Sequence, residues 1–394
     1  MNNDHPEKKI LFLVFLTFSI IYHIGCSKQH EKNDQLTNEL SVIRIDSTVI
    51  DRGLFFRQGR NVHFQKVSDI LIKTRSQNYQ ITKYGHCQYL RGRIYILDRF
   101  IPEIYVFDKK GQYLKTIRIK MNRVPKGSIF SELLILNNTD LLVKNARFST
   151  VFWIDSTGTI LKTFSSGDSG IFLAPRNMDI VRTSNGIHVY SIIWQGIKSK
   201  KEYSNIFSHA LRIGHFNERG ELVKRFGQFD PLYEKYNLEP FMPTTLRVWN
   251  KRIYHLQQAL PFVQVFTLSG DYLGQFGVPG IHMRPIEKIP KQLDSEMQTK
   301  ILQRHSLFSG IYILTHCPGY PDPILLVFYQ NTDELGEKHN YIILYSEEGE
   351  VLLNDLEIPA VPQQTINGSK LLLVYRIEKD VVRLGIFELS VSSK

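Results

Sequence analysis

Polar residues end six short apolar stretches that are spread along the chain. The chemistry of these end positions differs from that of the residues before them, since acids, amides and hydroxyls follow aliphatic side chains. In chain order the end positions are Asp98, Asn145, Ser191, Gln257, Thr315 and Tyr375. Such groups can fix a polar ligand if the fold brings the six stretches together.

Arginine and aromatic residues follow most of these end positions, and they are the types best suited to hold a ligand. Arginine binds carboxylate or phosphate through two parallel hydrogen bonds, and aromatic rings offer flat stacking surfaces. The candidate ligand-binding residues are therefore Asp98, Arg99, Arg147, Trp194, Gln257, His316, Tyr320 and Arg376, with Phe100 in one of the same loops. The alternative for each residue is that it solvates a loop or caps a strand end, because loops are polar without function.

Four histidines raise the question of a catalytic metal. His86, His188, His255 and His316 lie on or beside expected inner strands, and imidazoles from several strands can coordinate a cation. However, no carboxylate stands in the same register and no ligand spacing is diagnostic. The sequence also lacks the Gly-x-Ser-x-Gly motif of hydrolases. We assign no metal, cofactor or catalytic residue, and we favour a protein that is not an enzyme. A metal-dependent hydrolase or lyase, with a divalent cation in a central channel, is the alternative.

A hairpin that recurs five times indicates which elements position these residues. Each copy is an apolar strand, a polar turn that ends in glycine, and a second strand; the first copy reads IYVFDKKGQYLKTI. The copies span residues 104–117, 151–164, 213–226, 263–276 and 342–355, with turn glycines Gly111, Gly158, Gly220, Gly270 and Gly349. Asp, Asn, Ser or Thr stands three residues before each glycine, where its side chain can start a type I turn that glycine closes with a positive φ.

The apolar stretches that precede these hairpins complete a unit of four antiparallel strands. We expect the second strand of each unit at residues 92–98, 139–145, 185–191, 251–257, 309–315 and 369–375. Six such units predict an all-β fold, a six-bladed β-propeller of four-stranded antiparallel blades. The sixth unit lacks its outer strand, and an open blade edge would expose unpaired backbone groups. An N-terminal strand must therefore close the last blade, and residues 69–74 are preferred over residues 42–46.

The predicted ring places the candidate residues on one face, at the mouth of the central channel. In a propeller, the loops after the second strands share a face with the connections between blades, and the glycine hairpins lie opposite. Insertions are expected at residues 192–210, with Trp194 exposed, at 228–243, and at 278–305, with helix only around 292–302. Cys87 and Cys317 fall in the first and fifth blades, too far apart for a disulfide, so both should be buried thiols.

The N-terminus has the features of an export signal. Lys8 and Lys9 precede an uncharged run of thirteen residues, 10–22, which is shorter than the ~20 residues that span a bilayer. Gly25 and Cys26 follow, in an arrangement that resembles a bacterial lipoprotein signal. We predict a signal peptide at residues 1–25, lipidation of Cys26, a polar tether at 26–40 and the propeller at 41–394. An uncleaved signal anchor, or secretion with an incidental cysteine, is the alternative.

The charge balance first suggests a nucleic-acid partner. The 394 residues include 49 Lys and Arg against 38 Asp and Glu, a net charge of +11. The basic residues are scattered rather than clustered, and an exported protein rarely meets nucleic acid. We therefore expect no nucleic-acid partner, and we expect the positive charge to favour anionic lipid head groups or an acidic ligand.

The strand cadence also resembles that of a known group. The segments IYILD (94–98) and IYVFDKKG (104–111) are similar to the six-bladed β-propeller lipoproteins of Bacteroidota, relatives of the NHL-repeat propellers. The resemblance covers nearly the whole chain after the signal and implies the fold rather than a function, because many members of that group have no assigned activity. NHL relatives include protein binders, RNA binders and a metal-dependent lyase. We expect an exported protein, lipid-anchored to a membrane of the cell envelope on the periplasmic or outer-membrane side, that binds or scaffolds a glycan, peptide or envelope protein.

Overall fold

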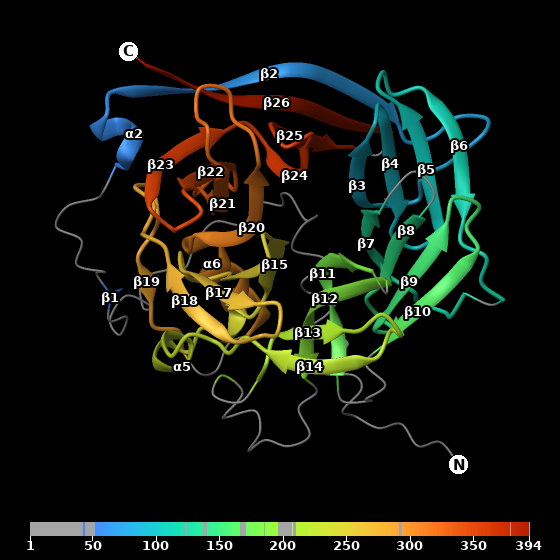
Figure 1. Ribbon diagram of the computed structural model, residues 1–394, viewed down its shortest axis with the longest axis horizontal. Coiled ribbons are helices and arrows are strands. Elements are labelled where there is room, and N and C mark those ends of the chain that lie inside the picture. Colours follow the sequence, from blue (N-terminus) through green and yellow to red (C-terminus); the bar gives the residue numbers. More distant parts are fainter. Residues whose placement is uncertain are drawn as a thin grey trace.

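The chain folds into a ring of six four-stranded antiparallel sheets, as the computed structural model shows (Figure 1). This confirms the predicted six-bladed β-propeller. The structure describes residues 42–43, 52–122, 124–136, 140–165, 171–184, 186–195, 207, 210–290, 294–378 and 380–393. The predicted signal peptide (1–25), Cys26 and the tether (26–40) lie outside these residues and stay predictions.

The blades follow one another along the chain, and each begins at the ring axis. The first five end at the periphery, whereas the outermost strand of blade 6 comes from the N-terminal part of the chain. Blades 1 and 2 contain β3 (Tyr84–Leu90), β4 (Arg93–Asp98), β5 (Glu103–Asp108), β6 (Tyr113–Arg118), β7 (Phe130–Ile135), β8 (Asp140–Asn145), β9 (Thr150–Asp155) and β10 (Ile160–Ser165). Blades 3 and 4 contain β11 (Ile171–Thr183), β12 (Gly186–Gln195), β13 (Ile213–Phe216), β14 (Leu222–Phe226), β15 (Thr244–Trp249), β16 (Arg252–Gln257), β17 (Val263–Thr267) and β18 (Tyr272–Phe276). Blades 5 and 6 contain β20 (Leu307–Leu314), β21 (Ile324–Thr332), β22 (Lys338–Tyr345), β23 (Val351–Ile358), β24 (Val361–Ile366), β25 (Lys370–Ile377), β26 (Val381–Ser393) and β2 (Arg60–Lys73).

The five predicted hairpins are present, and their turns form as the residue types indicate. In the first, the Asp108 carboxylate accepts hydrogen bonds from the backbone N–H groups of Lys110 (2.8 Å) and Gln112 (2.9 Å). Gly111 has φ 82° and packs against β2 of the neighbouring blade, where a Cβ atom would lie 2.3 Å from the Leu71 carbonyl oxygen. The turn glycine is thus required both by the turn and by the close approach of the next blade.

The sixth blade is closed by an N-terminal strand, as predicted. Residues 69–73 belong to β2, which pairs antiparallel with β26 from Arg60 opposite Ser393 to Lys73 opposite Val381. In Figure 1 the blue N-terminal strand lies directly beside the red C-terminal one. The other predicted candidate, residues 42–46, contributes β1 (Val42–Ile43), which pairs with β19 (Ile286–Glu287) outside the blades.

One predicted strand position is wrong. Residues 309–315 were expected to form the second strand of blade 5, but they lie in and just after β20, the innermost strand of that blade. The second strand is β21, whose residues are almost all buried. Innermost and second strands are both packed on two faces, so their apolar cadence does not distinguish them.

Insertions between the blades form a covering over blades 3 to 5, here called the cap. Its helical elements are α5 (Leu232–Tyr236), η1 (Glu239–Phe241) and α6 (Ser295–Arg304). Only α6 was predicted. The cap encloses its own apolar cluster, which contains Phe229, Tyr233, Leu238, Phe241, Ile286, Ile289 and Leu302. A short helix, α2 (Leu54–Arg57), precedes β2.

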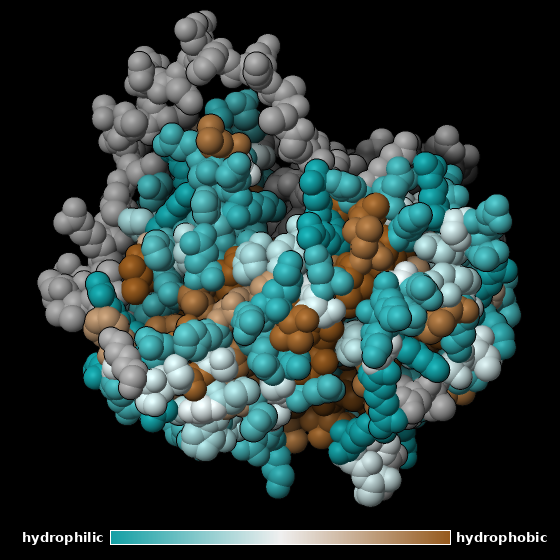
Figure 2. Space-filling view, turned by 90° about the horizontal axis from the view of Figure 1, so that it is seen from above, coloured by the Kyte–Doolittle hydropathy of each residue, from teal (hydrophilic) through white to brown (hydrophobic). Residues whose placement is uncertain are grey.

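The core consists of apolar clusters that fill the spaces between neighbouring blades. Cys87 and Cys317 are buried free thiols, which confirms the prediction for both. The side of the molecule in Figure 2 is largely hydrophilic with a few hydrophobic patches, and β2, on this side, exposes Val67 and Leu71. Within the described residues, no helix has the length and apolarity needed to cross a membrane.

Candidate functional site

Asp98 was expected at a ligand-binding mouth, but its carboxylate is fully buried. It accepts hydrogen bonds from the backbone N–H groups of Thr82 (2.6 Å) and Lys83 (3.3 Å), which precede β3. It also accepts from Phe100 (2.8 Å) and Ile101 (3.1 Å), which follow β4. Asp98 therefore holds two loops to the end of blade 1.

The same register position serves the same purpose in two other blades. Asn145 accepts a hydrogen bond from the Ile129 backbone N–H at 3.4 Å. Gln257 accepts one from Asp230 N–H and donates one to the Gln228 carbonyl, both at 3.0 Å. In each case a side chain at the end of a strand forms hydrogen bonds with the backbone of the connection that enters its own blade. The geometry of Asp98 and Gln257 thus corresponds to capping of strand ends.

Trp194 was expected to be exposed in a loop, but it lies within β12, which continues to Gln195. Trp194 pairs across the sheet with Phe172, and its ring is half-buried beneath the cap. The guanidinium carbon of Arg212 lies 4.4 Å from the centre of the ring. The longer strand turns a predicted surface residue into a packing residue.

His316 and Tyr320 lie on the face opposite the predicted one. Residues 309–314 belong to the innermost strand, so the loop after them joins the first and second strands of blade 5. Loops of this kind lie on the face opposite to the loops that follow the second strands. The backbone N–H of His316 donates to the Gly368 carbonyl at 3.0 Å, in the turn between β24 and β25. The Tyr320 ring packs edge-on against Phe55, with ring centres 5.1 Å apart.

The three arginine candidates, in contrast, lie on one face and on neighbouring blades. They lie at or just after the ends of the second strands of blades 6, 1 and 2, in segments here called the arginine loops. These segments are Arg376–Ile377, the last two residues of β25, and Arg99–Phe100 and Arg147–Phe148, in the loops after β4 and β8. The apolar residue after each arginine is exposed, by 41% at Ile377, 49% at Phe100 and 42% at Phe148. The sequence reasoning passed over Phe148 and Ile377, although an arginine followed by a large apolar residue occurs near the end of the second strand in all three of these blades.

The cap leaves the arginine loops uncovered. In blade 4, the loop after the second strand is buried beneath the cap, with Ala259 and Leu260 exposed by 3% and 1%. Next to the arginine loops, Lys126 is exposed, and the Arg147 guanidinium donates to the Gly127 carbonyl at 3.3 Å. Arg376 pairs with Glu378 at 2.5 Å while staying largely exposed. The surface over blades 6, 1 and 2 therefore combines positive charge with exposed apolar side chains.

The four histidines do not converge on one point. His188 Nδ1 lies 2.9 Å from His215 Nε2 within blade 3, and His255 Nδ1 lies 2.9 Å from Gln264 Oε1 within blade 4. Burial lowers the pKa of His215 to about 4, with nearby His188 as a further cause, and burial also lowers that of His255 to about 4. Both imidazoles are therefore neutral near pH 7. Across the described part of the chain, no group of three or more His, Cys, Asp or Glu side chains is arranged to hold a metal ion.

Polar side chains on the innermost strands join the blades to one another. At each junction, a side chain of one innermost strand forms a hydrogen bond with the backbone of the next innermost strand. The side chains, in order around the ring, are Gln88, Glu132, Asp179, Arg247, Tyr312 and Gln364. The polar groups nearest the axis are thus used to fasten the ring.

Two of these junctions include buried charge. Lys144 Nζ donates to Ser191 Oγ at 2.7 Å and lies 4.0 Å from the Glu132 carboxylate. Burial lowers the pKa of Lys144 to about 8, against the opposing effect of Glu132, and burial raises the pKa of Glu132. Asp179 lies 3.9 Å from Arg247 in the next blade. These charges compensate one another inside the fold and leave little exposed surface for a ligand.

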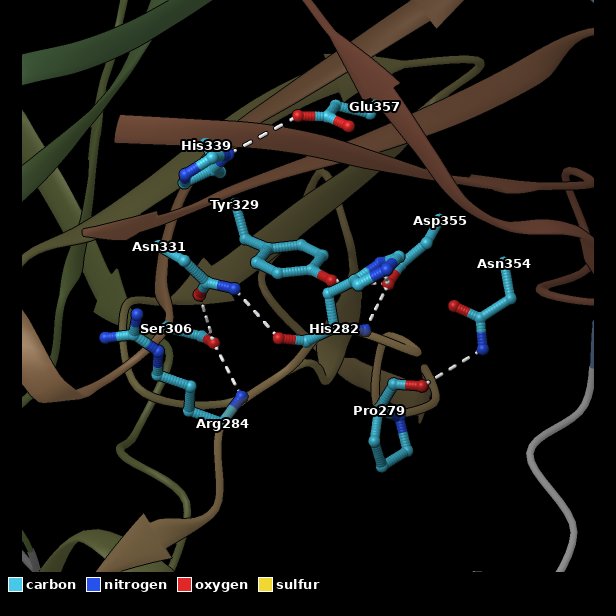
Figure 3. Close-up of polar contacts among 10 residues, drawn as sticks. All are labelled: Pro279, His282, Arg284, Ser306, Tyr329, Asn331, His339, Asn354, Asp355 and Glu357. Carbon is cyan, nitrogen blue, oxygen red and sulfur yellow. Dashed lines mark hydrogen bonds and ion pairs between the residues drawn. The ribbon is translucent and has the colours of Figure 1, made fainter. Parts of the chain in front are cut away.

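A polar cluster that the sequence reasoning missed fastens the cap to blade 5 (Figure 3). The buried Asp355 carboxylate accepts hydrogen bonds from the His282 backbone (2.6 Å), the His282 ring (3.1 Å) and the Tyr329 hydroxyl (2.6 Å). Asp355 has φ 61°, and Gly280 lies so close that a Cβ atom would approach Asp355 Oδ1 to 2.6 Å. Burial and the neighbouring carboxylate raise the pKa of Tyr329, which therefore stays protonated as the donor.

Comparison with models of known families and with curated proteins finds no match. Among solved structures, a member of the DUF4221 family from Bacteroides vulgatus is 13% identical, with a TM-score of 0.60 and coverage of 85% of this chain and 100% of that chain. A Bacteroides fragilis protein described as exported is 12% identical, with a TM-score of 0.49 and coverage of 85% and 96%. A streptogramin B lyase is 12% identical, with a TM-score of 0.41 and coverage of 81% and 98%. The first similarity shows that the chain shares its fold with a Bacteroides propeller, and at this identity it shows the fold alone.

Proposed function

We propose that the protein is a binding or scaffold propeller of the cell envelope that holds an acidic partner against its arginine loops. The observation that carries the proposal is an arginine followed by an exposed apolar residue, repeated on three neighbouring blades. Arginine forms strong bidentate bonds with carboxylates, and Phe100 and Phe148 add apolar contact area beside it. Arginine and aromatic residues are also enriched among the residues that dominate interface energetics.

The residues available on this surface favour a peptide or protein over a glycan. The stacking residues expected for a sugar were Trp194 and Tyr320, but Trp194 packs beneath the cap and Tyr320 lies on the other face. What remains is positive charge and apolar area, which suits an acidic segment with interspersed apolar residues. The net charge of +11 supports the same polarity of partner.

The proposal includes export and a lipid anchor. The predicted signal peptide at residues 1–25 and the lipidation of Cys26 would place the propeller at a membrane, on the periplasmic or outer-membrane side. A partner confined to the same envelope meets an anchored propeller at raised effective concentration. Moderate affinity at the arginine loops is then sufficient for a stable complex.

Photo-crosslinking in cells tests the proposed surface. A photoreactive phenylalanine analogue in place of Phe148 should give a discrete adduct with one envelope protein, identified by mass spectrometry. The adduct should be lost when Arg99 and Arg147 are both changed to glutamate, because charge reversal repels an acidic partner. The same analogue at Leu273, exposed on β18 of blade 4, is the matched control.

The crosslinking experiment has three outcomes that test the proposed binding surface. An adduct at Phe148 but not at Leu273, abolished by the charge reversal, supports the proposal. Equal adducts at both positions contradict it, since they report random encounters. Adducts with phospholipid rather than protein would mean that the arginine loops face the membrane instead of a protein partner.

A further inference from the structure

A buried arginine lies beneath the cap, where blade 3 meets blade 4. Arg212 directly precedes β13 and is 1% exposed. One of its terminal nitrogens donates to the Met242 carbonyl at 3.3 Å. Its Nε atom is buried without a hydrogen-bond partner, and in the described part of the chain no carboxylate pairs with it.

Aromatic rings lie close to the Arg212 guanidinium. The guanidinium carbon is 4.4 Å from the centre of the Trp194 ring and 5.1 Å from that of Phe229. Stacked rings stabilise a cation through its faces. They supply no acceptor for the N–H groups, which point outward in the guanidinium plane. Any acceptor for Nε would have to approach along the edge of the guanidinium group that carries this nitrogen.

A second orphaned donor lies beside the first. The indole Nε1 of Trp194 is also buried without a hydrogen-bond partner. Burial lowers the pKa of Arg212 to about 9, which reflects the unfavourable transfer of its charge from water. A buried cation and two unpaired N–H donors are costly to leave uncompensated. A group that supplies negative charge and two acceptor oxygens would satisfy all three requirements.

We infer that Arg212 and Trp194 form a binding site for a small carboxylate. A carboxylate is planar, so one oxygen can accept from Arg212 Nε while the other accepts from Trp194 Nε1. Trp194 is half-buried whereas Arg212 is 1% exposed, so the indole is the more exposed part of the site. The site lies at blades 3 and 4, apart from the arginine loops, and does not depend on the function proposed for them.

Fluorescence and thermal unfolding of the full chain test this site with acetate as the probe. The chain contains three tryptophans, so changing Trp153 and Trp249 to phenylalanine leaves Trp194 as the only indole. Acetate should change Trp194 fluorescence saturably and raise the Tm, relative to chloride at equal ionic strength, because ligands stabilise the state they bind. Arg212→Met should weaken acetate binding about tenfold or more, since it removes the charged donor. Arg225→Met, which removes an exposed arginine on β14, is the control and should bind acetate normally.

A double-mutant cycle separates a bound ligand from a partner within the chain. Glu202 is the only acidic residue in the stretch 196–209, which joins β12 to the segment before Arg212. Without acetate, Arg212→Met should not lower the Tm, because it removes an uncompensated buried charge. An acetate response that persists in Arg212→Met would overturn the inference. Equal and non-additive losses of Tm in Arg212→Met and Glu202→Gln would overturn it as well, since Glu202 would then be the counter-ion.

Discussion

At the scale of single residues, Asp98 shows that a side chain predicted to bind a ligand can have a structural role instead. Its two carboxylate oxygens accept four backbone N–H groups, two from the segment before β3 and two from the loop after β4. Hydrogen bonds from backbone N–H groups to a carboxylate are strong, so the two segments are held firmly to the end of blade 1. The neighbouring Arg99 leaves the strand and belongs to the arginine loops.

Asp98→Ala should lower the free energy of unfolding by about 2–4 kcal/mol, because it leaves buried N–H groups without an acceptor. Lys126→Ala, at an exposed loop residue, should change it by less than about 0.5 kcal/mol. Urea unfolding of both variants measures the difference. Equal, small effects would mean that Asp98 is available to a ligand after all.

The candidate site residues could be placed from the sequence where their position depended only on the neighbouring strand. Arg99, Arg147 and Arg376 lie on the expected face because each lies at or within two residues of the end of a correctly identified second strand. Trp194 could not be placed, since its burial depends on how far β12 extends and on a cap assembled from distant segments. Tyr320 was misplaced because two kinds of strand share one apolar pattern. The polar cluster of Asp355 left no sequence signal, because its members come from three separate segments.

At the scale of elements, the pairing of β2 with β26 is reinforced by charge. The Arg383 guanidinium donates to the Asp69 carboxylate at 2.6 Å, across the pair of strands that closes the ring. This hydrogen bond, together with the attraction of the two charges, holds the pKa of Asp69 below its usual range. Both side chains are more than a third exposed, so solvent screens much of their interaction.

The depressed pKa gives this pair a defined pH dependence. An acid whose pKa falls on folding adds stability above its unfolded pKa of about 3.9, and loses that contribution as the pH falls through the folded value. Asp69→Asn should therefore cost no more than about 1 kcal/mol above roughly pH 5, and progressively less as the pH falls below the unfolded pKa of about 3.9. Unfolding free energies of both proteins across that range provide the test. A difference that does not change with pH would contradict an ionic contribution.

The elements themselves were predictable where the signal was local. The glycine hairpins follow from turn chemistry contained within a few residues, and all five are present. The short helices of the cap depend instead on distant contacts. The buried Tyr233 hydroxyl, for example, donates to the Phe241 carbonyl and accepts from the Ala259 backbone, both at 3.0 Å. A five-residue helix has no stability of its own, so its sequence carries no periodic signal.

At the scale of the whole molecule, the ring is held by two kinds of closure. Hydrogen bonds between innermost strands fasten all six junctions near the axis, and β2 fastens the last blade at the periphery. Each blade thus depends on both neighbours, and the loss of one junction affects the entire ring. Cooperative unfolding of the described propeller is the expected result.

Removal of β2 tests this cooperativity. A chain that begins at Arg52 keeps β2 and should melt cooperatively, within a few degrees of the full chain. A chain that begins at Gln80 lacks β2, exposes the edge of β26 and should lose the sharp transition. Calorimetry of the two chains distinguishes them. A sharp transition in the shorter chain would show that five complete blades are stable without the closing strand.

The pairing of β2 with β26 also determines when the protein can finish folding. Residues 60–73 are synthesised long before their hydrogen-bond partners at residues 381–393. Contacts between such distant segments form late and slowly. Until residues 381–393 have been synthesised, β2 therefore lacks its partner strand, and the ring stays open. For a chain exported in the way its N-terminus predicts, this delay keeps the polypeptide loose enough to be threaded through a narrow pore, and closure follows on the far side.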